Sequence, residues 1–241
     1  MTSLWLVIFL LKRIPVSSKS FIPSDPGTRK FKGEPGCRVY LIRHGEVANA
    51  HLICMNGHYD VELSKKGEQQ MQEVAEALNP LPLKAVYSSD LTRTFTGARL
   101  IAEKHNLEPV AFPELRELSF GKWEGMSIKE LTEKFPGEME KRIKNTELFR
   151  ADEGETFDEL AARVVPRYKA IIEQHPNDVI AIMSHGGVNR TILSHLLGIP
   201  TVHLFRFAQE YAAINVIQYY PDQVVVELMN GSCRDIGPRP S

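Results

Sequence analysis

The 241-residue sequence is poor in cysteine and carries almost no net charge. Its three cysteines, Cys37, Cys54 and Cys233, stand at irregular intervals, which gives neither a disulfide framework nor a zinc-binding pattern. Three free thiols are typical of a reducing compartment, so we expect a cytoplasmic protein. The formal net charge of -1 gives no global positive field. We therefore expect no nucleic-acid partner, and any site for an anion must be local.

Long apolar runs are also missing. The stretch LWLVIFLL, residues 4–11, is far shorter than the roughly 20 residues that span a bilayer, and two basic residues follow it where a signal peptide would have small ones. Residues 15–36 are rich in Ser, Pro, Gly and Lys, as linkers are. We expect residues 1–36 to be a disordered extension without stable membrane association; a weak membrane or targeting segment is the alternative. A single domain is expected over 37–230, and a disordered tail over 231–241.

The middle of the chain alternates predicted strands and helices. Hydrophobic content of 43% and charged content of 24% are ordinary for a soluble globular protein with a sizeable core. Apolar runs predict strands over 38–42, 83–90, 108–112 and 178–183 and a terminal hairpin over 212–229. Helical periodicity predicts helices over 63–79, 90–105, 156–175 and 188–200, the second with a buried stripe of Leu91, Phe95, Ala98 and Ala102. This alternation predicts an α/β fold, a three-layer αβα sandwich with a mostly parallel sheet.

Three predicted strands end in polar residues that are capable of chemistry. The segments at or directly after the ends of these strands are Arg43-His44-Gly45-Glu46, Ser88-Ser89-Asp90 and Ser184-His185-Gly186-Gly187. Ligands of parallel sheets bind at the carboxyl ends of the strands. We therefore expect these three segments to meet at one edge of the sheet.

The groups expected at that edge are two imidazoles, His44 and His185, and two permanent cations, Arg43 and Arg93. Arginine forks onto phosphate, and a glycine-rich helix start such as that at Gly186 offers backbone N–H groups to anions. The sequence has no Gly-x-Ser-x-Gly elbow and no phosphate-binding P-loop. An imidazole among cations stays neutral, so a histidine is the candidate nucleophile, and a carboxylic acid is needed to protonate the leaving alkoxide.

Several blocks in order resemble the histidine phosphatase superfamily, also called the phosphoglycerate mutase-like family. They are RHGE, LSKKG, SSDLTR, LRELSFGKWEG and SHGGVNR, and the similarity covers roughly residues 38–230. The resemblance implies a phosphoglycerate mutase-like fold, with no metal and no cofactor. Within the family the chain is similar to the alpha-ribazole phosphatase and broad-specificity phosphatase branch.

The resemblance also implies residue roles. His44 matches the phosphorylated histidine, Arg43 and Arg93 the arginines that clamp phosphate, and His185 the second histidine on the phosphoryl oxygens. Glu117 matches the proton donor, with Glu114 and Glu124 close by in sequence. Substrate binding is expected from Arg43, Arg93, His185 and Gly186, and from Asn49 in one of two possible registers. The chain departs from the family pattern at Val47, Thr94 and Gly97.

The function that the resemblance implies is hydrolysis of a small phosphorylated metabolite through phosphohistidine on His44. One alternative is a cofactor-dependent phosphoglycerate mutase, although mutases of the family carry Glu-Arg-His-Tyr-Gly around the acid and this chain has FGKWEG. Others are an inactive phosphate-binding module and a metal hydrolase using His44, Glu46 and His185. The substrate is not identified, and a homodimer stays open.

Substrate specificity is expected to depend on a cover segment, residues 127–152. Its basic residues Lys141, Arg142, Lys144 and Arg150 either reach a second anionic group of the substrate or form a solvated face.

Overall fold

The computed structural model describes residues 33–146 and 148–236. Predicted segments at residues 1–32 and 237–241 lie outside this part. The strands are β1 (Arg38–Arg43), β2 (Leu83–Ser88), β3 (Val110–Ala111), β4 (Val179–Ser184), β5 (Ile214–Tyr219) and β6 (Val224–Gly231). The α-helices are α1 (Lys65–Leu78), α2 (Thr92–Lys104), α3 (Ile128–Lys134), α4 (Glu138–Lys144), α5 (Phe157–Glu173), α6 (Gly186–Leu197) and α7 (Cys233–Ile236). Short 3-10 turns are η1 (Ala50–Leu52), η2 (Pro113–Leu115), η3 (Gly121–Trp123) and η4 (Thr201–Arg206).

The six strands form one sheet in the order β3-β2-β4-β1-β5-β6. The pairs β1–β4, β2–β4 and β2–β3 are parallel, whereas β1–β5 and β5–β6 are antiparallel. The predicted mostly parallel sheet and the terminal hairpin are therefore both confirmed. An antiparallel pair on an otherwise parallel sheet is common in folds of this class.

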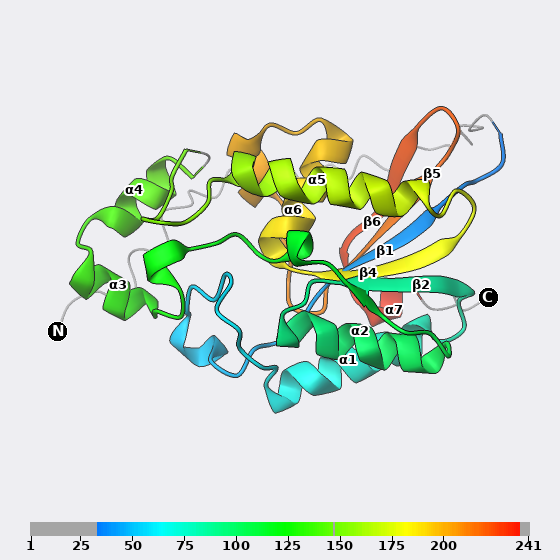
Figure 1. Ribbon diagram of the computed structural model, residues 1–241, viewed down its shortest axis with the longest axis horizontal. Coiled ribbons are helices and arrows are strands. Elements are labelled where there is room, and N and C mark those ends of the chain that lie inside the picture. The colour runs from blue at the N-terminus through cyan, green and yellow to red at the C-terminus, as the bar shows by residue number, and fades with distance from the viewer. Residues whose placement is uncertain (1–32, 147, 237–241) are drawn as a thin grey trace, which may run out of the picture. The chain divides into compact units, whose positions relative to one another are not determined.

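Helices cover both faces of the sheet, which confirms the predicted three-layer sandwich. Figure 1 shows α5 and α6 on one face and α1 and α2 on the other. Along β1, Val39 and Leu41 join the core under α5 and α6, while Tyr40 and Ile42 join the core over α1 and α2. This alternation explains why β1 reads as a continuous apolar run: successive side chains point to opposite faces, and both faces are buried.

Local capping sets where two of the covering helices begin. The Ser64 hydroxyl accepts a hydrogen bond from the backbone N–H of Gly67 at the start of α1. Thr156 and Glu159 form the predicted capping box of α5, with both reciprocal hydrogen bonds present. Pro166 lies inside α5, which continues past it to Glu173.

Two local predictions differ from the structure. Of the stripe predicted for α2, Leu91, Ala98 and Ala102 are buried and only Phe95 is exposed, while Arg93 and Gly97 are buried as well. Residues 231–236 are ordered where a disordered tail was expected, because α7 packs on α1 and its Cys233 and Ile236 contact the apolar core of that layer. The buried face of α2 thus keeps most of the predicted stripe and also includes the cation Arg93.

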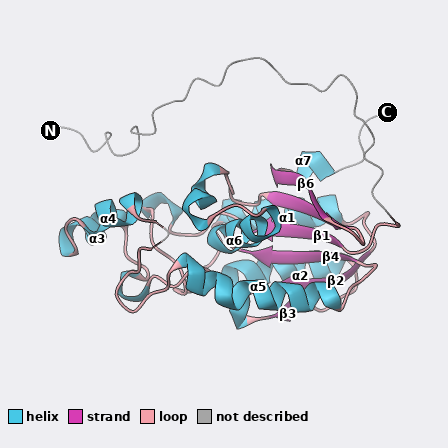
Figure 2. Ribbon diagram, turned by 90° about the horizontal axis from the view of Figure 1, so that it is seen from above, coloured by secondary structure: helices cyan, strands magenta, loops and turns pink. Residues whose placement is uncertain are grey.

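The cover segment forms α3 and α4. Figures 1 and 2 both show these two helices beyond the carboxyl ends of β1 and β4, away from the layers on the two sheet faces. A capping box of Ser127 and Glu130 begins α3. No helix in the described part of the chain is long and apolar enough to cross a membrane.

Candidate active site

The polar ends of the parallel strands meet, as the sequence predicts. Arg43 at the end of β1 pairs in register with Ser184 at the end of β4, and Ser88 at the end of β2 pairs with Met183. The backbone N–H of His44 donates to the Ser184 carbonyl at 3.0 Å. The sheet therefore holds the segments after β1, β2 and β4 side by side at one edge.

Two glycines explain why the RHGE and LSKKG segments occur together. A Cβ on Gly45 would lie 2.4 Å from the carbonyl oxygen of Gly67, and a Cβ on Gly67 would lie 2.0 Å from that of Glu46. Only residues without side chains permit this backbone approach. The Glu46 carboxylate accepts hydrogen bonds from Ser64 and Lys66, so Glu46 ties the strand end to α1.

His44 is buried, with 6% of its surface exposed, and only one of its two nitrogens has a hydrogen-bond partner among the described residues. Its Nδ1 lies 2.8 Å from the Gly45 carbonyl oxygen. Because a carbonyl oxygen can only accept, Nδ1 must carry the proton, and this leaves a lone pair on Nε2. Burial, together with the nearby charges of Arg93 and Arg43, lowers the pKa of His44 well below its usual value, so the imidazole is neutral.

His185 lies against His44, with ring centroids 5.2 Å apart and planes at 67°. Its Nε2 is 2.8 Å from the Ser89 hydroxyl, which comes from the segment after β2. Its Nδ1 is buried and has no hydrogen-bond partner in the described structure. Burial and the charge of Arg93 lower the pKa of His185 well below its usual value, so it too is neutral.

Arg93 reaches the site from the first turn of α2 and is 1% exposed. Its two terminal nitrogens donate to the carbonyl oxygens of Tyr59 at 3.0 Å and Gly57 at 2.6 Å. Burial lowers the pKa of Arg93, but a guanidinium stays charged in proteins. The loop before α1 therefore holds a buried cation whose charge acts on both imidazoles.

Arg43 is held by residues that the sequence analysis did not identify. Its Nη1 donates to the Gln209 carbonyl at 2.5 Å, and its guanidinium carbon lies 4.2 Å from the centroid of the Tyr211 ring. The Tyr211 ring is also 5.7 Å from that of His44. The Nε of Arg43 is buried without a hydrogen-bond partner among the described residues.

Glu117 is fixed at the start of α6. Its carboxylate accepts hydrogen bonds from the backbone N–H of Leu118 and of Gly187, each at 2.9 Å. A Cβ on Gly187 would lie 2.4 Å from the Glu117 Oε1, so the second glycine of the SHGG segment makes room for the acid. Glu117 also interacts electrostatically with Arg93.

The two neighbouring carboxylates have structural partners instead. Glu114 forms an ion pair with Arg167 at 2.5 Å. Glu124 accepts backbone hydrogen bonds from His58, Tyr59 and Phe120. Of the three glutamates considered from the sequence, Glu117 is the one that contacts the SHGG segment.

Arg163 of α5 organises the loop that carries Glu117, and the sequence analysis missed it. Its guanidinium donates to the backbone carbonyls of Glu114, Arg116 and Glu117 at 2.7–2.9 Å. It also forms an ion pair with Glu155 at 2.7 Å. A charged residue inside a helical pattern is the only signal in the sequence, and many solvated arginines share it.

Of the two remaining residues predicted to bind substrate, Gly186 lies next to the cluster and Asn49 is paired with another side chain. Gly186 adjoins Arg43, since a Cβ there would lie 3.4 Å from the Arg43 Nε. The Asn49 side-chain amide is paired reciprocally with that of Asn56 at 2.8 and 2.9 Å, rather than with any of the charged site residues. The structure therefore brings Gly186 to the cluster and gives Asn49 another partner.

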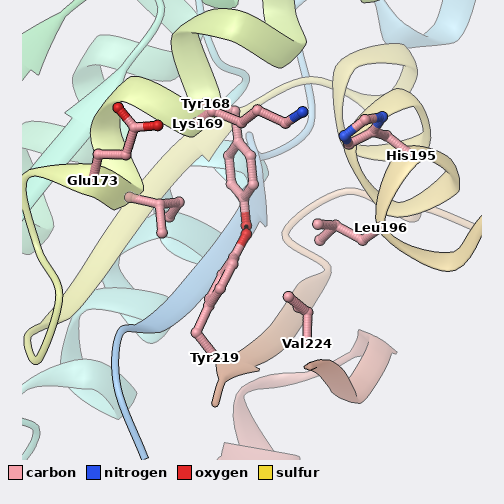
Figure 3. A pocket seen from close by; sticks show the side chains of 8 residues that line it. Tyr168, Lys169, Glu173, His195, Leu196, Tyr219 and Val224 are labelled. Atoms are coloured by element: carbon pink, nitrogen blue, oxygen red, sulfur yellow. Dashed lines mark hydrogen bonds between the residues drawn. The ribbon is translucent and has the colours of Figure 1, made fainter. Parts of the chain in front are cut away.

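In the described part of the chain, no group of three or more His, Cys, Asp or Glu residues is placed to hold a metal ion. A hollow of about 410 Å³ lies between α5, α6 and the β5–β6 hairpin, and none of the site residues named above lines it (Figure 3). Tyr168 and Tyr219 meet there through their hydroxyl groups, 3.0 Å apart.

A comparison with protein families places the whole described domain in one superfamily. The model of the histidine phosphatase superfamily, branch 1, matches residues 39–232. The chain belongs to this superfamily. Its phosphoglycerate mutase-like fold is thereby confirmed, and the superfamily contains both phosphatases and mutases.

Individual relatives of this chain include both phosphatases and mutases. Phosphoserine phosphatase 1 of Hydrogenobacter thermophilus is 28% identical over 81% of this chain and 93% of its own length. "Probable phosphoglycerate mutase GpmB" of an Enterobacter species is 32% identical over 76% of this chain and 85% of its own. The crystal structure of the alpha-ribazole phosphatase from Shigella flexneri superposes with a TM-score of 0.75, at 26% identity, over 80% of this chain and 96% of that one.

Proposed function

We propose that this protein is a phosphomonoesterase that hydrolyses a small phosphorylated metabolite through a phosphohistidine on His44. The observation that carries the proposal is the free Nε2 of a buried neutral imidazole beside two guanidinium groups. A neutral histidine is a nucleophile, and guanidinium groups bind phosphate and stabilise the charge of the transferring phosphoryl group.

Two buried polar atoms support a phosphoryl ligand at this place. The Nε of Arg43 and the Nδ1 of His185 have no hydrogen-bond partner among the described residues. Buried polar groups ordinarily have partners, and a tetrahedral oxyanion bound next to His44 offers acceptor oxygens in several directions. Both atoms adjoin groups of the cluster, since Gly186 lies against Arg43 and the His185 ring against His44.

In the first step the Nε2 of His44 attacks phosphorus, the N–P bond forms and the P–O bond to the alcohol breaks. Glu117, in its carboxylic acid form, gives its proton to the leaving oxygen. In the second step the Glu117 carboxylate takes a proton from water, which attacks phosphorus and breaks the N–P bond. Inorganic phosphate leaves, and His44 and the acid return to their first states.

The experiment that tests the proposal is Glu117→Gln. The amide can neither give nor take the proton, so turnover of an alkyl phosphate should collapse. The nitrophenolate of para-nitrophenyl phosphate needs little protonation, so phosphorylation of His44 should survive better than overall turnover. We expect a burst of nitrophenol followed by a slow steady rate, measured by stopped flow.

Glu114→Gln is the matched control, because Glu114 lies in the same loop but pairs with Arg167. It should keep both activities within a few-fold of wild type. Equal impairment of Glu117→Gln on both substrates, without a burst, would place the acid on another residue.

The mutase alternative has support in the "Probable phosphoglycerate mutase GpmB" relatives. It is tested by incubating wild type with 3-phosphoglycerate and catalytic 2,3-bisphosphoglycerate. Release of inorganic phosphate without efficient formation of 2-phosphoglycerate is expected of a phosphatase. Rapid interconversion of the two phosphoglycerates would overturn the proposal in favour of the mutase.

A further inference from the structure

The basic residues of the cover segment separate into two groups in the structure. Lys141 forms an ion pair with Glu138 at 2.5 Å, and Arg150 pairs with Glu159. Lys144 is exposed. These three behave as a solvated face, which was one of the two expectations for this segment. Arg142 differs from them.

Arg142 is turned inward from α4 onto two aromatic rings. Its guanidinium carbon lies 4.9 Å from the centroid of the Phe120 ring and 5.8 Å from that of Phe149. Burial lowers its pKa to about 10, and the group remains a cation at neutral pH. No carboxylate in the described part of the chain forms an ion pair with it. A guanidinium that stacks on rings keeps the N–H groups at its edge available for an anion.

Contacts connect this cation to the phosphate clamp. Phe120, on which Arg142 lies, packs against Gly57, since a Cβ on Gly57 would be 2.8 Å from the Phe120 ring. The Gly57 carbonyl in turn accepts the hydrogen bond from Arg93. Phe120 is also three residues after Glu117, whose charge acts on Arg142 as well as on Arg93. Arg142 is therefore on the same side of the molecule as the reacting groups, one aromatic ring away from the loop that holds Arg93.

We propose that Arg142 binds a carboxylate of the substrate, so that the preferred substrates are phosphomonoesters that also carry a carboxylate a few bonds from the phosphate. This rests on the proposed phosphatase function. One fixed guanidinium matches one planar carboxylate, which accepts its forked N–H groups bidentately. A second phosphate fits this subsite less well than a carboxylate. It would bring nearly two negative charges to one guanidinium, which has no ion-pair partner among the described residues.

The test uses two ligands that differ only at the relevant group. 3-Phosphoglycerate has a carboxylate where sn-glycerol 3-phosphate has a hydroxymethyl group. Arg142→Met removes the charge and keeps apolar volume against the two rings. We expect kcat/KM for 3-phosphoglycerate to fall roughly ten- to hundredfold, mainly through KM, since a charge-assisted contact of this kind has that effect. For sn-glycerol 3-phosphate the change should stay within about twofold.

Lys141→Met and Lys144→Met are the matched controls on the same helix and should leave both substrates unaffected. Equal losses on both substrates in Arg142→Met would mean that Arg142 supports the fold or the phosphate clamp, and would overturn the inference. An unchanged kcat/KM for 3-phosphoglycerate would overturn it too.

A binding measurement separates this inference from the proposed function. Titration calorimetry of His44→Ala with each ligand needs no turnover, and the preference for 3-phosphoglycerate should again disappear in the double variant with Arg142→Met. If wild type hydrolyses no phosphomonoester while this preference is present, the phosphatase function fails and the subsite stands. If para-nitrophenyl phosphate is hydrolysed through His44 but the two ligands bind equally, the subsite fails and the function stands.

Discussion

Strand β4 has a histidine near each end, and the two have opposite surroundings. His175, before the strand, lies between the Tyr87 hydroxyl and the Asp178 carboxylate, each 2.8 Å from one of its nitrogens. His185, after the strand, has one nitrogen without a hydrogen-bond partner among the described residues, and the charges of three arginines act on it. A histidine with both nitrogens engaged has none to offer a substrate. We therefore expect free nitrogens and the sign of neighbouring charge, rather than burial alone, to distinguish a reactive histidine from a structural one.

The largest effect is expected from removing the proposed nucleophile, His44, and the structural histidine His175 provides the contrast. His44→Ala should lower kcat by at least roughly a thousandfold, because no other group at the site replaces the attacking nitrogen. Rapid quench of wild type should trap a phosphoenzyme that is labile to acid and stable to base. His175→Ala should keep its turnover and lose about 1–3 kcal/mol of unfolding free energy, because Tyr87 and Asp178 lose their partner. Full activity in His44→Ala, or phosphate on a serine, would remove the basis of the mechanism.

Helix α2 carries two arginines in different surroundings, the buried Arg93 beside the two histidines and the exposed Arg99. Arg93→Ala removes a buried charge that acts on the transferring phosphoryl group, and a loss of roughly a hundredfold or more in kcat/KM is expected. Arg99→Ala on the same helix breaks only an exposed pair with Glu103 and should be neutral. Steady-state kinetics with para-nitrophenyl phosphate measures both, and similar values for the two variants would make Arg93 a structural residue.

Arg163 tests whether a residue can act on the reaction through the loop that it holds. Arg163→Met should lower kcat for an alkyl phosphate about tenfold, since a small displacement of Glu117 impairs proton transfer. The loss on para-nitrophenyl phosphate should be smaller, because that leaving group needs little protonation. Arg167→Met, which breaks the Glu114 pair, is the control. A uniform loss on both substrates would indicate general destabilisation instead.

The smallest expected effect is on how the free energy of unfolding changes with pH. His44 and His185 have folded-state pKa values below the unfolded value of 6.5, so the unfolded chain binds protons first as the pH falls. The stability is fully present above about pH 6.5 and declines below it, by up to about 1.4 kcal/mol per pH unit for each group. In phosphate-free buffer, urea unfolding of His185→Asn between pH 7 and 5 should show a shallower decline than wild type. Parallel curves would mean that His185 takes up its proton in the folded state.

Much of the fold was predictable because its signals are local. The continuous apolar run of β1 and the capping box of α5 depend on residues close in sequence, and both appear as predicted. The face of α2 was predicted correctly at Leu91, Ala98 and Ala102 and wrongly at Phe95, because a rule that buries apolar residues chose Phe95, whereas the structure buries Arg93. The ordered α7 was missed because four residues carry too little periodicity to identify a helix.

The sequence predicted which residues would lie together at this sheet edge better than it predicted their contacts. The ordered blocks identified His44, His185 and the arginines, and the sheet brings them together. Tyr211 and Gln209, which hold Arg43, precede a predicted strand without any distinguishing pattern. Asn49 was expected at the phosphate, but a neighbour 7 residues away takes up its amide.

By itself the sequence determined which chemical groups stand after β1, β2 and β4, since strand length and chain order decide that. Only the tertiary structure decided what each group can do. The Gly45 carbonyl fixes the proton on Nδ1 of His44, the start of α6 selects Glu117 among three glutamates, and two aromatic rings turn Arg142 inward. The physical reason is the separation along the sequence over which each interaction acts. Periodicity and capping act over a few residues, whereas hydrogen bonds such as that of Gly187 to Glu117 join groups 70 residues apart, and only the packed layers bring those partners together.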